Sequence, residues 1–266
     1  MPSPLVAIKL VPLGHATSMD QVAAALNEAA VTSDVAPPPC VGDFMSSAPT
    51  RVRGMAAMVL GYADGGSLAD VMRSAYSRRK PLTPAVAMHF ATQLALALKH
   101  VHDAGYAHLD LKPANVLLAS AQAGMVASSA RWKAANRLGR QQAVVKLSDF
   151  GVAAVAPGPG EPRLTGLAGS PPYMAPEMLS GAGYGREADV FSFGVLLYEL
   201  LAGGVRPFPG TTLETAGRAI LTRRPAALPP HVPRELAAIV KAMLRKDPAA
   251  RPTFADILVS PPFAAA

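Results

Sequence analysis

The pattern of hydrophobic positions changes character along the chain. Near the start, apolar residues form short runs at residues 6–11, 40–45 and 51–60, which predict three strands. Between the first two runs, apolar residues recur at helical spacing after Ser18, which predicts a helix over residues 18–31. The chain up to residue 60 therefore resembles a small β-rich unit with one helix.

From residue 62 onward the pattern becomes mainly helical. A glycine-rich turn precedes a short helix that begins at Leu68. Thr83 is a typical N-cap residue and is followed by a proline, which favours the start of a helix. Helices are predicted over residues 84–103, 188–201 and 234–244. The larger, C-terminal part is therefore mostly α-helical.

Residues 119–142 differ in composition from their surroundings. They are rich in Ala, Ser and Arg, contain the only tryptophan, Trp132, and lie between two strand-like runs. We interpret them as an exposed insertion. A short basic helix around residues 130–138 is the alternative.

Composition favours a folded domain with a basic surface. Half of the 266 residues are hydrophobic and only 16% are charged, which suits one substantial core or two lobes that share one. The formal net charge of +7 could indicate a nucleic-acid binder, but the basic residues are scattered and their densest clusters are short. We therefore expect no nucleic-acid partner, and a solvated surface that suits acidic partners or phosphate.

Two features bear on the cellular environment. Cys40 is the only cysteine, so no disulfide can form within the chain, which is typical of a reducing compartment. No run reaches the roughly 18 uncharged apolar residues of a membrane span. We expect a cytoplasmic protein without a membrane span in this chain.

Three motifs carry the candidate chemistry. They are His-Leu-Asp-Leu-Lys-Pro-Ala-Asn at residues 108–115, Lys-Leu-Ser-Asp-Phe-Gly at 146–151, and Gly-Ser-Pro-Pro-Tyr-Met-Ala-Pro-Glu at 169–177. Each is weak alone, but in this order they resemble the catalytic loop, the Asp-Phe-Gly motif and the Ala-Pro-Glu motif of eukaryotic protein kinases. The resemblance extends from Val6 to about Phe254.

The resemblance implies an α+β fold of the bilobal protein kinase type. Residues 1–62 would form a small, incomplete, β-rich N-lobe with one helix, and residues 63–266 a larger, mainly α C-lobe with the insertion at 119–142. It also implies ATP and Mg²⁺ as the ligands and a protein as the substrate. Asp110 would accept the proton of the substrate hydroxyl, Lys112 would reach the γ-phosphate, and Asn115 and Asp149 would hold the metal.

The resemblance also implies a nucleotide pocket. Lys9 ends a Val-Ala-Ile-Lys run that matches the family's third strand, where it would contact the α- and β-phosphates and pair with Glu28. The adenine would lie between Ala7 and Leu117. Leu60 would guard the back of the pocket, and the backbone of Gly61, Tyr62 and Ala63 would form the hinge.

Further residues would support this site. Phe150 and Gly151 complete the Asp-Phe-Gly motif, and Ser170 would bridge Asp110 and Lys112. Asp189 would brace the catalytic loop through backbone N–H groups, and Arg251 would pair with Glu177. Lys112 and the residues before the Ala-Pro-Glu motif are of the serine/threonine form. A weaker resemblance in the hinge points to the tyrosine-kinase-like and MAP-kinase-cascade groups.

Three departures from the family pattern stand out. No Gly-x-Gly-x-x-Gly precedes Lys9, so we expect a domain truncated before its glycine-rich loop. Leu109 replaces an arginine that would bind a phosphate on the activation segment, whose only hydroxyl is Thr165. The interval from Asn115 to Asp149 is roughly twenty residues longer than usual. An active serine/threonine kinase is the favoured interpretation; a pseudokinase or scaffold, and a metabolic small-molecule kinase, are the alternatives.

Overall fold

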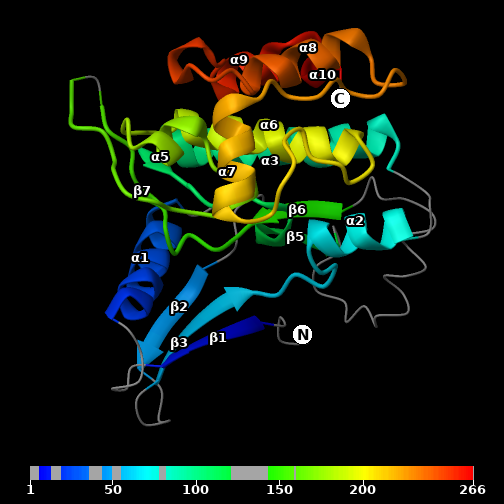
Figure 1. Cartoon of the computed structure of the whole chain (residues 1–266). Coiled ribbons are helices and arrows are strands. Elements are labelled where there is room, and N and C mark those ends of the chain that lie inside the picture. Colours follow the sequence, from blue (N-terminus) through cyan, green and yellow to red (C-terminus); the bar gives the residue numbers. More distant parts are fainter. Residues whose placement is uncertain are drawn as a thin grey trace.

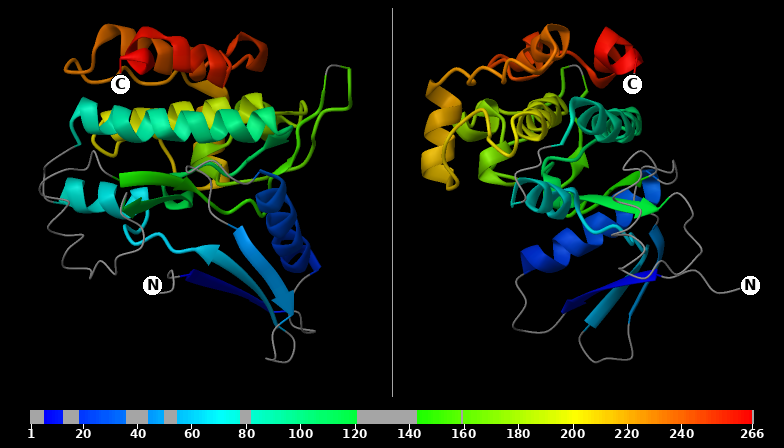
Figure 2. Two further views of the ribbon diagram at one scale, coloured as in Figure 1. Left: turned by 180° about the vertical axis from the view of Figure 1, so that it is seen from behind. Right: turned by 90° about the vertical axis from the view of Figure 1, so that its right-hand side faces the viewer.

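A computed structural model of the chain describes residues 6–12, 19–35, 44–49, 55–77, 82–120, 143–158 and 160–265. Figure 1 shows a small β-rich part that carries one helix, and a larger part made mostly of helices. In both views of Figure 2 the helical part lies above the β-rich part. This arrangement confirms the predicted α+β bilobal fold.

The β-rich part is an antiparallel sheet in the strand order β1-β3-β2. Its strands are β1 (Val6–Pro12), β2 (Phe44–Pro49) and β3 (Met55–Gly61), and helix α1 (Met19–Val35) lies beside them. Lys9 on β1 is paired with Met58, which is buried. On β1 the residues Val6, Ile8 and Leu10 are exposed, whereas Val31 and Val35 near the end of α1 are buried.

The helical part is built around α6 (Glu187–Leu201). Every residue of α6 except Glu187 and Glu199 is buried, as expected for a helix that is apolar on all sides. Gly194 allows α6 to approach Met243 closely, since a Cβ at position 194 would lie 2.9 Å from the Met243 side chain. The other helices among the described residues are α2 (Leu68–Ser77), α3 (Pro84–Asp103), α5 (Pro176–Ser180), α7 (Leu213–Thr222), α8 (Arg234–Met243), α9 (Phe254–Val259) and α10 (Pro261–Ala264). None of the described helices is long and apolar enough to span a bilayer.

Two short ladders lie against helices α2 and α3 and flank the motif residues. Strand β4 (Tyr106–Ala107) pairs with β7 (Ala154–Val155), and β5 (Val116–Ser120) pairs with β6 (Ala143–Leu147). The part of the chain that the structure describes also contains the 3₁₀ turns η1 (Pro113–Asn115), η3 (Pro171–Tyr173) and η4 (Pro248–Ala250). The catalytic-loop motif therefore lies between β4 and β5, and the Asp-Phe-Gly motif between β6 and β7.

Several predicted boundaries need correction. The second strand extends to Pro49 instead of ending at residue 45, whereas its predicted residues 40–43 and residues 51–54 of the third strand lie outside the described residues. Backbone pairing sets the end of the second strand, because Pro49 pairs with Ala56 on β3, whatever the local hydrophobicity. Helix α1 also extends to Val35 instead of ending at residue 31.

The predicted insertion starts two residues too early. Ala119 and Ser120 belong to β5, where they pair with Val144 and Ala143, so they are strand residues. Trp132 and the rest of the predicted insertion lie outside the described residues, as do Ser18 and Cys40.

Candidate active site

Asp110 lies at the centre of a hydrogen-bonded cluster. Lys112 Nζ donates to Asp110 Oδ2 at 2.6 Å, and Ser170 Oγ donates to Asp110 Oδ1 at 2.8 Å. Lys112 also donates to Ser170 Oγ at 2.9 Å, so the expected bridge through Ser170 is present. Asn115 Nδ2 lies 3.1 Å from Asp110 Oδ2 and donates to the Asp110 carbonyl at 2.9 Å. Both carboxylate oxygens are therefore oriented, and the side chain is only 12% exposed.

Asp189 holds the backbone of the catalytic loop from the first turn of α6. Its Oδ2 accepts from the His108 N–H at 2.7 Å, and its Oδ1 from the Leu109 N–H at 2.8 Å. His102 Nε2 lies 2.9 Å from Oδ2. Complete burial disfavours the carboxylate, but the hydrogen bonds and charge of His102 and His108 together outweigh it and lower the pKa of Asp189. The bracing expected of Asp189 is thus present.

Two residues with a strained backbone lie in the catalytic loop and in the Asp-Phe-Gly motif. Leu109 and Asp149, with φ of 65° and 67°, are the non-glycine residues with positive φ in the described part of the chain. Such backbone costs about 1–3 kcal/mol per residue and persists where surrounding contacts impose it. Gly169 is one such contact, because a Cβ there would lie 2.3 Å from the Leu109 carbonyl oxygen. The segment that carries Ser170 is therefore pressed against the catalytic loop.

Lys9 lies between two carboxylates. Its Nζ is 2.5 Å from Glu28 Oε2 and 3.6 Å from Asp149 Oδ1, so the expected ion pair with Glu28 is present. The Glu28 side chain is 5% exposed, whereas those of Lys9 and Asp149 are 43% and 44% exposed. Burial lowers the pKa of Lys9, but the hydrogen bond and charge of Glu28, assisted by Asp149, raise it above its usual value. Lys9 is therefore a cation open to solvent on one side.

Asn27 is a site residue that the sequence analysis missed. Its Nδ2 lies 3.1, 3.4 and 2.7 Å from the carbonyl oxygens of Phe150, Gly151 and Ala153. Asn27 therefore ties α1 to the backbone of the Asp-Phe-Gly motif. An amide side chain on a helix gives no motif or charge signal; its place beside Glu28 was the sole indication.

The β5–β6 ladder brings the two predicted metal residues together. Val116, directly after Asn115, pairs with Leu147, and the Ser148 N–H donates to the Asn115 carbonyl at 3.0 Å. Asp149 follows Ser148. Phe150 is buried, and its ring meets the edge of the His108 ring at a centroid distance of 4.9 Å. The catalytic loop and the Asp-Phe-Gly motif thus form one packed unit.

The chemistry of Asn115 and Asp149 suits a hard cation. Because Asn115 uses its amide nitrogen for Asp110, its amide oxygen remains as the atom for a metal. The Asp149 carboxylate is partly open to solvent. No group of three or more His, Cys, Asp or Glu residues that could hold a metal occurs among the described residues. Two protein oxygens fit Mg²⁺, which keeps several waters and binds substrate phosphates.

The predicted adenine residues lie on both parts of the molecule. Ala7 on β1 is paired with Leu60 on β3, and Tyr62, which is 50% exposed, and Ala63 follow directly. Leu117 on β5 is partly buried between two neighbours that are fully buried. Their contacts with a nucleotide stay a prediction.

Glu177 and Arg251 form a buried ion pair away from the reacting groups. Arg251 donates from both terminal nitrogens to the two Glu177 oxygens at 2.7 Å, and the side chains are 0% and 4% exposed. Arg251 also donates to the Glu187 carbonyl at 2.8 Å. The pair therefore fixes the Ala-Pro-Glu segment to the start of α6, as the resemblance implied.

Comparison with known proteins agrees with this geometry. The sequence model described as "Protein kinase domain" matches residues 3–263. Serine/threonine-protein kinase ULK3 from Xenopus laevis is 33% identical over 201 residues, covering 75% of this chain and 37% of that protein. Serine/threonine-protein kinase PkaA from Streptomyces coelicolor is 34% identical over 199 residues, covering 74% of this chain and 32% of that protein.

The chain belongs to the protein kinase domain family, and it is of the serine/threonine type. It spans about a third of the length of the relatives it matches. The weaker resemblance of the hinge to the tyrosine-kinase-like and MAP-kinase-cascade groups stays a prediction.

Proposed function

We propose that this protein transfers the γ-phosphoryl group of ATP to serine or threonine hydroxyl groups of a protein substrate, with Mg²⁺ as the metal. The protein kinase family uses ATP and typically Mg²⁺. The observation that carries the proposal is the Asp110 cluster, in which Lys112, Ser170 and Asn115 orient both carboxylate oxygens. A proton acceptor oriented beside a cation is what phosphoryl transfer to a hydroxyl requires.

Each residue has a distinct task in this proposal. Asp110 receives the proton of the attacking hydroxyl, while Lys112 offers positive charge to the transferred group. Lys9, held by Glu28, binds the phosphates that are not transferred. Bound Mg²⁺ neutralises charge on the phosphate oxygens, and Asn115 and Asp149 would hold it. The chain therefore supplies positioning and charge, which dominate catalysis of this reaction.

The preference for serine and threonine rests on two observations. Lys112 bonds to both Asp110 and Ser170, so the cation typical of the serine/threonine form is built into the cluster. Relatives from two distant organisms are also named serine/threonine-protein kinases.

The test is a phosphotransfer assay with identification of the product. The purified chain is incubated with Mg-ATP and a peptide mixture that offers serine, threonine and tyrosine. Phosphoserine or phosphothreonine is expected. Asp110→Asn should reduce turnover by about 10²-fold or more and leave Mg-ATP binding nearly unchanged, because the carboxylate meets the hydroxyl. Asp103→Asn, an exposed change at the end of α3, is the matched control.

Three outcomes would contradict the proposal. Asp110→Asn could retain full turnover, with contaminating kinases excluded, or phosphotyrosine could be the main product. If the chain neither binds Mg-ATP nor transfers phosphate, it is a kinase-fold binding module instead.

A further inference from the structure

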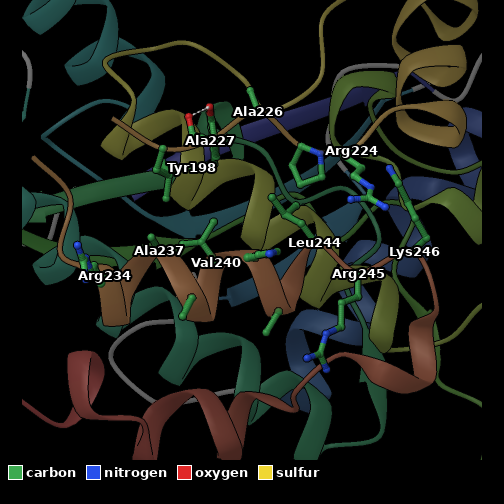
Figure 3. A pocket seen from close by; sticks show the side chains of 15 residues that line it. Tyr198, Arg224, Ala226, Ala227, Arg234, Ala237, Val240, Leu244, Arg245 and Lys246 are labelled. Carbon is green, nitrogen blue, oxygen red and sulfur yellow. Dashed lines mark hydrogen bonds between the residues drawn. The ribbon is translucent and has the colours of Figure 1, made fainter. Parts of the chain in front are cut away.

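A groove unrelated to the active site runs along α8. Its volume is about 810 Å³, and it lies between α8, the segment 224–228 before it and the segment 244–246 after it. Figure 3 shows Arg234 at one end of the groove and Lys246 at the other. Tyr198 closes it from α6, buried and donating from its hydroxyl to the Ala227 carbonyl at 3.1 Å. One wall of the groove is therefore formed by the buried helix α6.

The groove is lined by cations and by no acidic residue. Its basic residues are Arg224, Arg234, Lys241, Arg245 and Lys246. None of the five forms an ion pair with a carboxylate in the described part of the chain. An uncompensated cluster of like charges repels itself, so an anionic partner would be stabilised there.

The contacts of two of these cations are with neutral groups. Arg245 Nη1 donates to the Ala250 carbonyl at 2.6 Å. Lys246 donates to the Ile220 carbonyl, and its Nζ lies 4.0 Å from the centre of the Phe208 ring. Burial and the charge of Arg251 lower the pKa of Lys246 to about 8, so it remains mostly protonated at pH 7. Its positive charge therefore persists at neutral pH.

Between the cations the wall is apolar and small. Ala237 is partly buried and Ala238 exposed, and both lie between Arg234 and Lys241 on α8. Val240 and Leu244 form a buried floor. Arg234 and Lys241 are separated by roughly 10 Å along the helix axis, at about 1.5 Å per residue. An extended peptide covers that distance in about three residues.

We propose that this groove binds an extended acidic peptide segment of a partner protein, one that carries apolar side chains between its carboxylates. The carboxylates would meet the cations, and the apolar side chains would cover the alanines and the floor. Since the proposal concerns binding alone, it does not depend on the catalytic activity.

Two observations favour this occupant over others. The chain carries a formal net charge of +7, so a second copy of it would be repelled. A nucleic acid would gain from cations and exposed aromatic rings, but the aromatic residue of this lining, Tyr198, is buried. An apolar floor instead rewards a ligand that has both charge and hydrocarbon.

The experiment measures fluorescence anisotropy of a labelled peptide of alternating glutamate and leucine residues with the whole chain. Saturable binding is expected, weakening as salt is raised. Arg234→Glu with Lys241→Glu should reduce affinity at least about tenfold, because like charges then face the peptide. Ala238→Trp should also abolish binding by filling the groove without changing its charge. Lys99→Glu with Arg218→Glu is the matched control, exposed, outside the groove and equal in net charge.

Melting temperatures establish that each variant is folded. If one of the two groove variants does not fold, the other still tests the proposal. Undetectable peptide binding, or equal affinity in the wild type and both groove variants, would overturn the proposal. The proposal would also be overturned if a peptide of alternating glutamate and serine bound as tightly as the glutamate–leucine peptide, because the groove would then be a non-specific charged surface. Tighter binding of a single-stranded oligonucleotide or of anionic phospholipid vesicles, lost in the same variants, would assign the groove to that partner instead.

Discussion

The two sides of the active site are held in place by different kinds of contact. Around Asp110, hydrogen bonds come from three side chains, and the loop backbone is bonded to the fully buried Asp189. Lys9, in contrast, lies on a strand of the small sheet, is 43% exposed, and is held by Glu28 and Asp149. The Asp110 side is therefore held by buried groups, whereas the Lys9 side depends on the position of α1.

This contrast implies that stability and activity should separate between the two sides. A change that loosens the Asp110 side disturbs buried groups, so it should cost both folding free energy and turnover. A change on the Lys9 side should cost turnover while the protein stays folded. Asn27 joins the two, because it bonds α1 to the Asp-Phe-Gly segment.

The largest effect is expected from Asp189→Ala. It leaves the buried N–H groups of His108 and Leu109 without their acceptor, and each such group costs about 1–3 kcal/mol. We expect the free energy of unfolding to fall by about 3 kcal/mol or more and turnover to be lost. Urea denaturation and the phosphotransfer assay measure the two quantities.

Asp103→Ala is the control for this change, since that carboxylate is 60% exposed and should contribute less than about 1 kcal/mol. The pKa of Asp189 is lowered below its usual 3.8, so its stabilisation is present above that pH and is lost as the pH falls through the lowered value. A stable, active Asp189→Ala protein would remove the distinction between the two sides.

The second effect concerns Glu28→Gln. Glutamine keeps the size of the side chain but removes the charge that holds Lys9. We expect kcat/KM to fall by about 10- to 100-fold, equivalent to about 1.4–2.7 kcal/mol. The melting temperature should change by no more than a few degrees. A large loss of stability with unchanged turnover would reverse the comparison.

A smaller effect is expected from Asn27→Asp. The two side chains have the same shape, but a carboxylate would face the carbonyl oxygens of Phe150, Gly151 and Ala153. Turnover should fall about tenfold at pH 8, since hydrogen bonds of this kind contribute about 0.5–1.5 kcal/mol each. Turnover relative to wild type should recover as the pH falls, because a protonated carboxyl group can donate one bond again.

Asn27→Ala separates this mechanism from simple loss of packing. It removes the donors without adding charge, so its turnover should be reduced at every pH with no such recovery. If Asn27→Asp shows the same pH profile as Asn27→Ala, the carbonyl contacts do not position the motif.

The smallest effect is expected from Thr165→Ala. Thr165 is exposed, and Leu109, where related kinases carry a phosphate-binding arginine, is a buried apolar residue. Turnover should change by less than about twofold, because a phosphate at Thr165 would find no partner at Leu109. A large loss in Thr165→Ala that Thr165→Glu restores would show that another cation serves this purpose.

Sequence reasoning was most successful where the interacting residues are close in the chain or belong to one motif. Asp110, Lys112 and Asn115 share one loop, so their cluster follows from a short segment. The pairing of Lys9 with Glu28 was implied by the resemblance of one strand, and the helix directly after it, to the family pattern.

Features made by distant segments could not be predicted in the same way. The partners of Asn27 lie 123 to 126 residues further along the chain, and no local pattern marks them. The limits of β2 depend on its register with β3. The cations of the groove are scattered in sequence, so no local pattern marks them as a group, yet the fold gathers five of them around α8.

The β5–β6 ladder also affects how chain length can vary. Ser120 and Ala143 are register partners, and at the far end of the same ladder Val116 pairs with Leu147, next to Asn115 and Ser148. The distance between Asn115 and Asp149 is therefore determined by the paired strands and not by how many residues connect them. Lengthening or shortening the chain between Ser120 and Ala143 should therefore leave Asn115 and Asp149, the predicted metal ligands, where they are. A gene can gain or lose codons at this point without altering the chemistry, which makes it a place where evolution can add new sequence to an old enzyme.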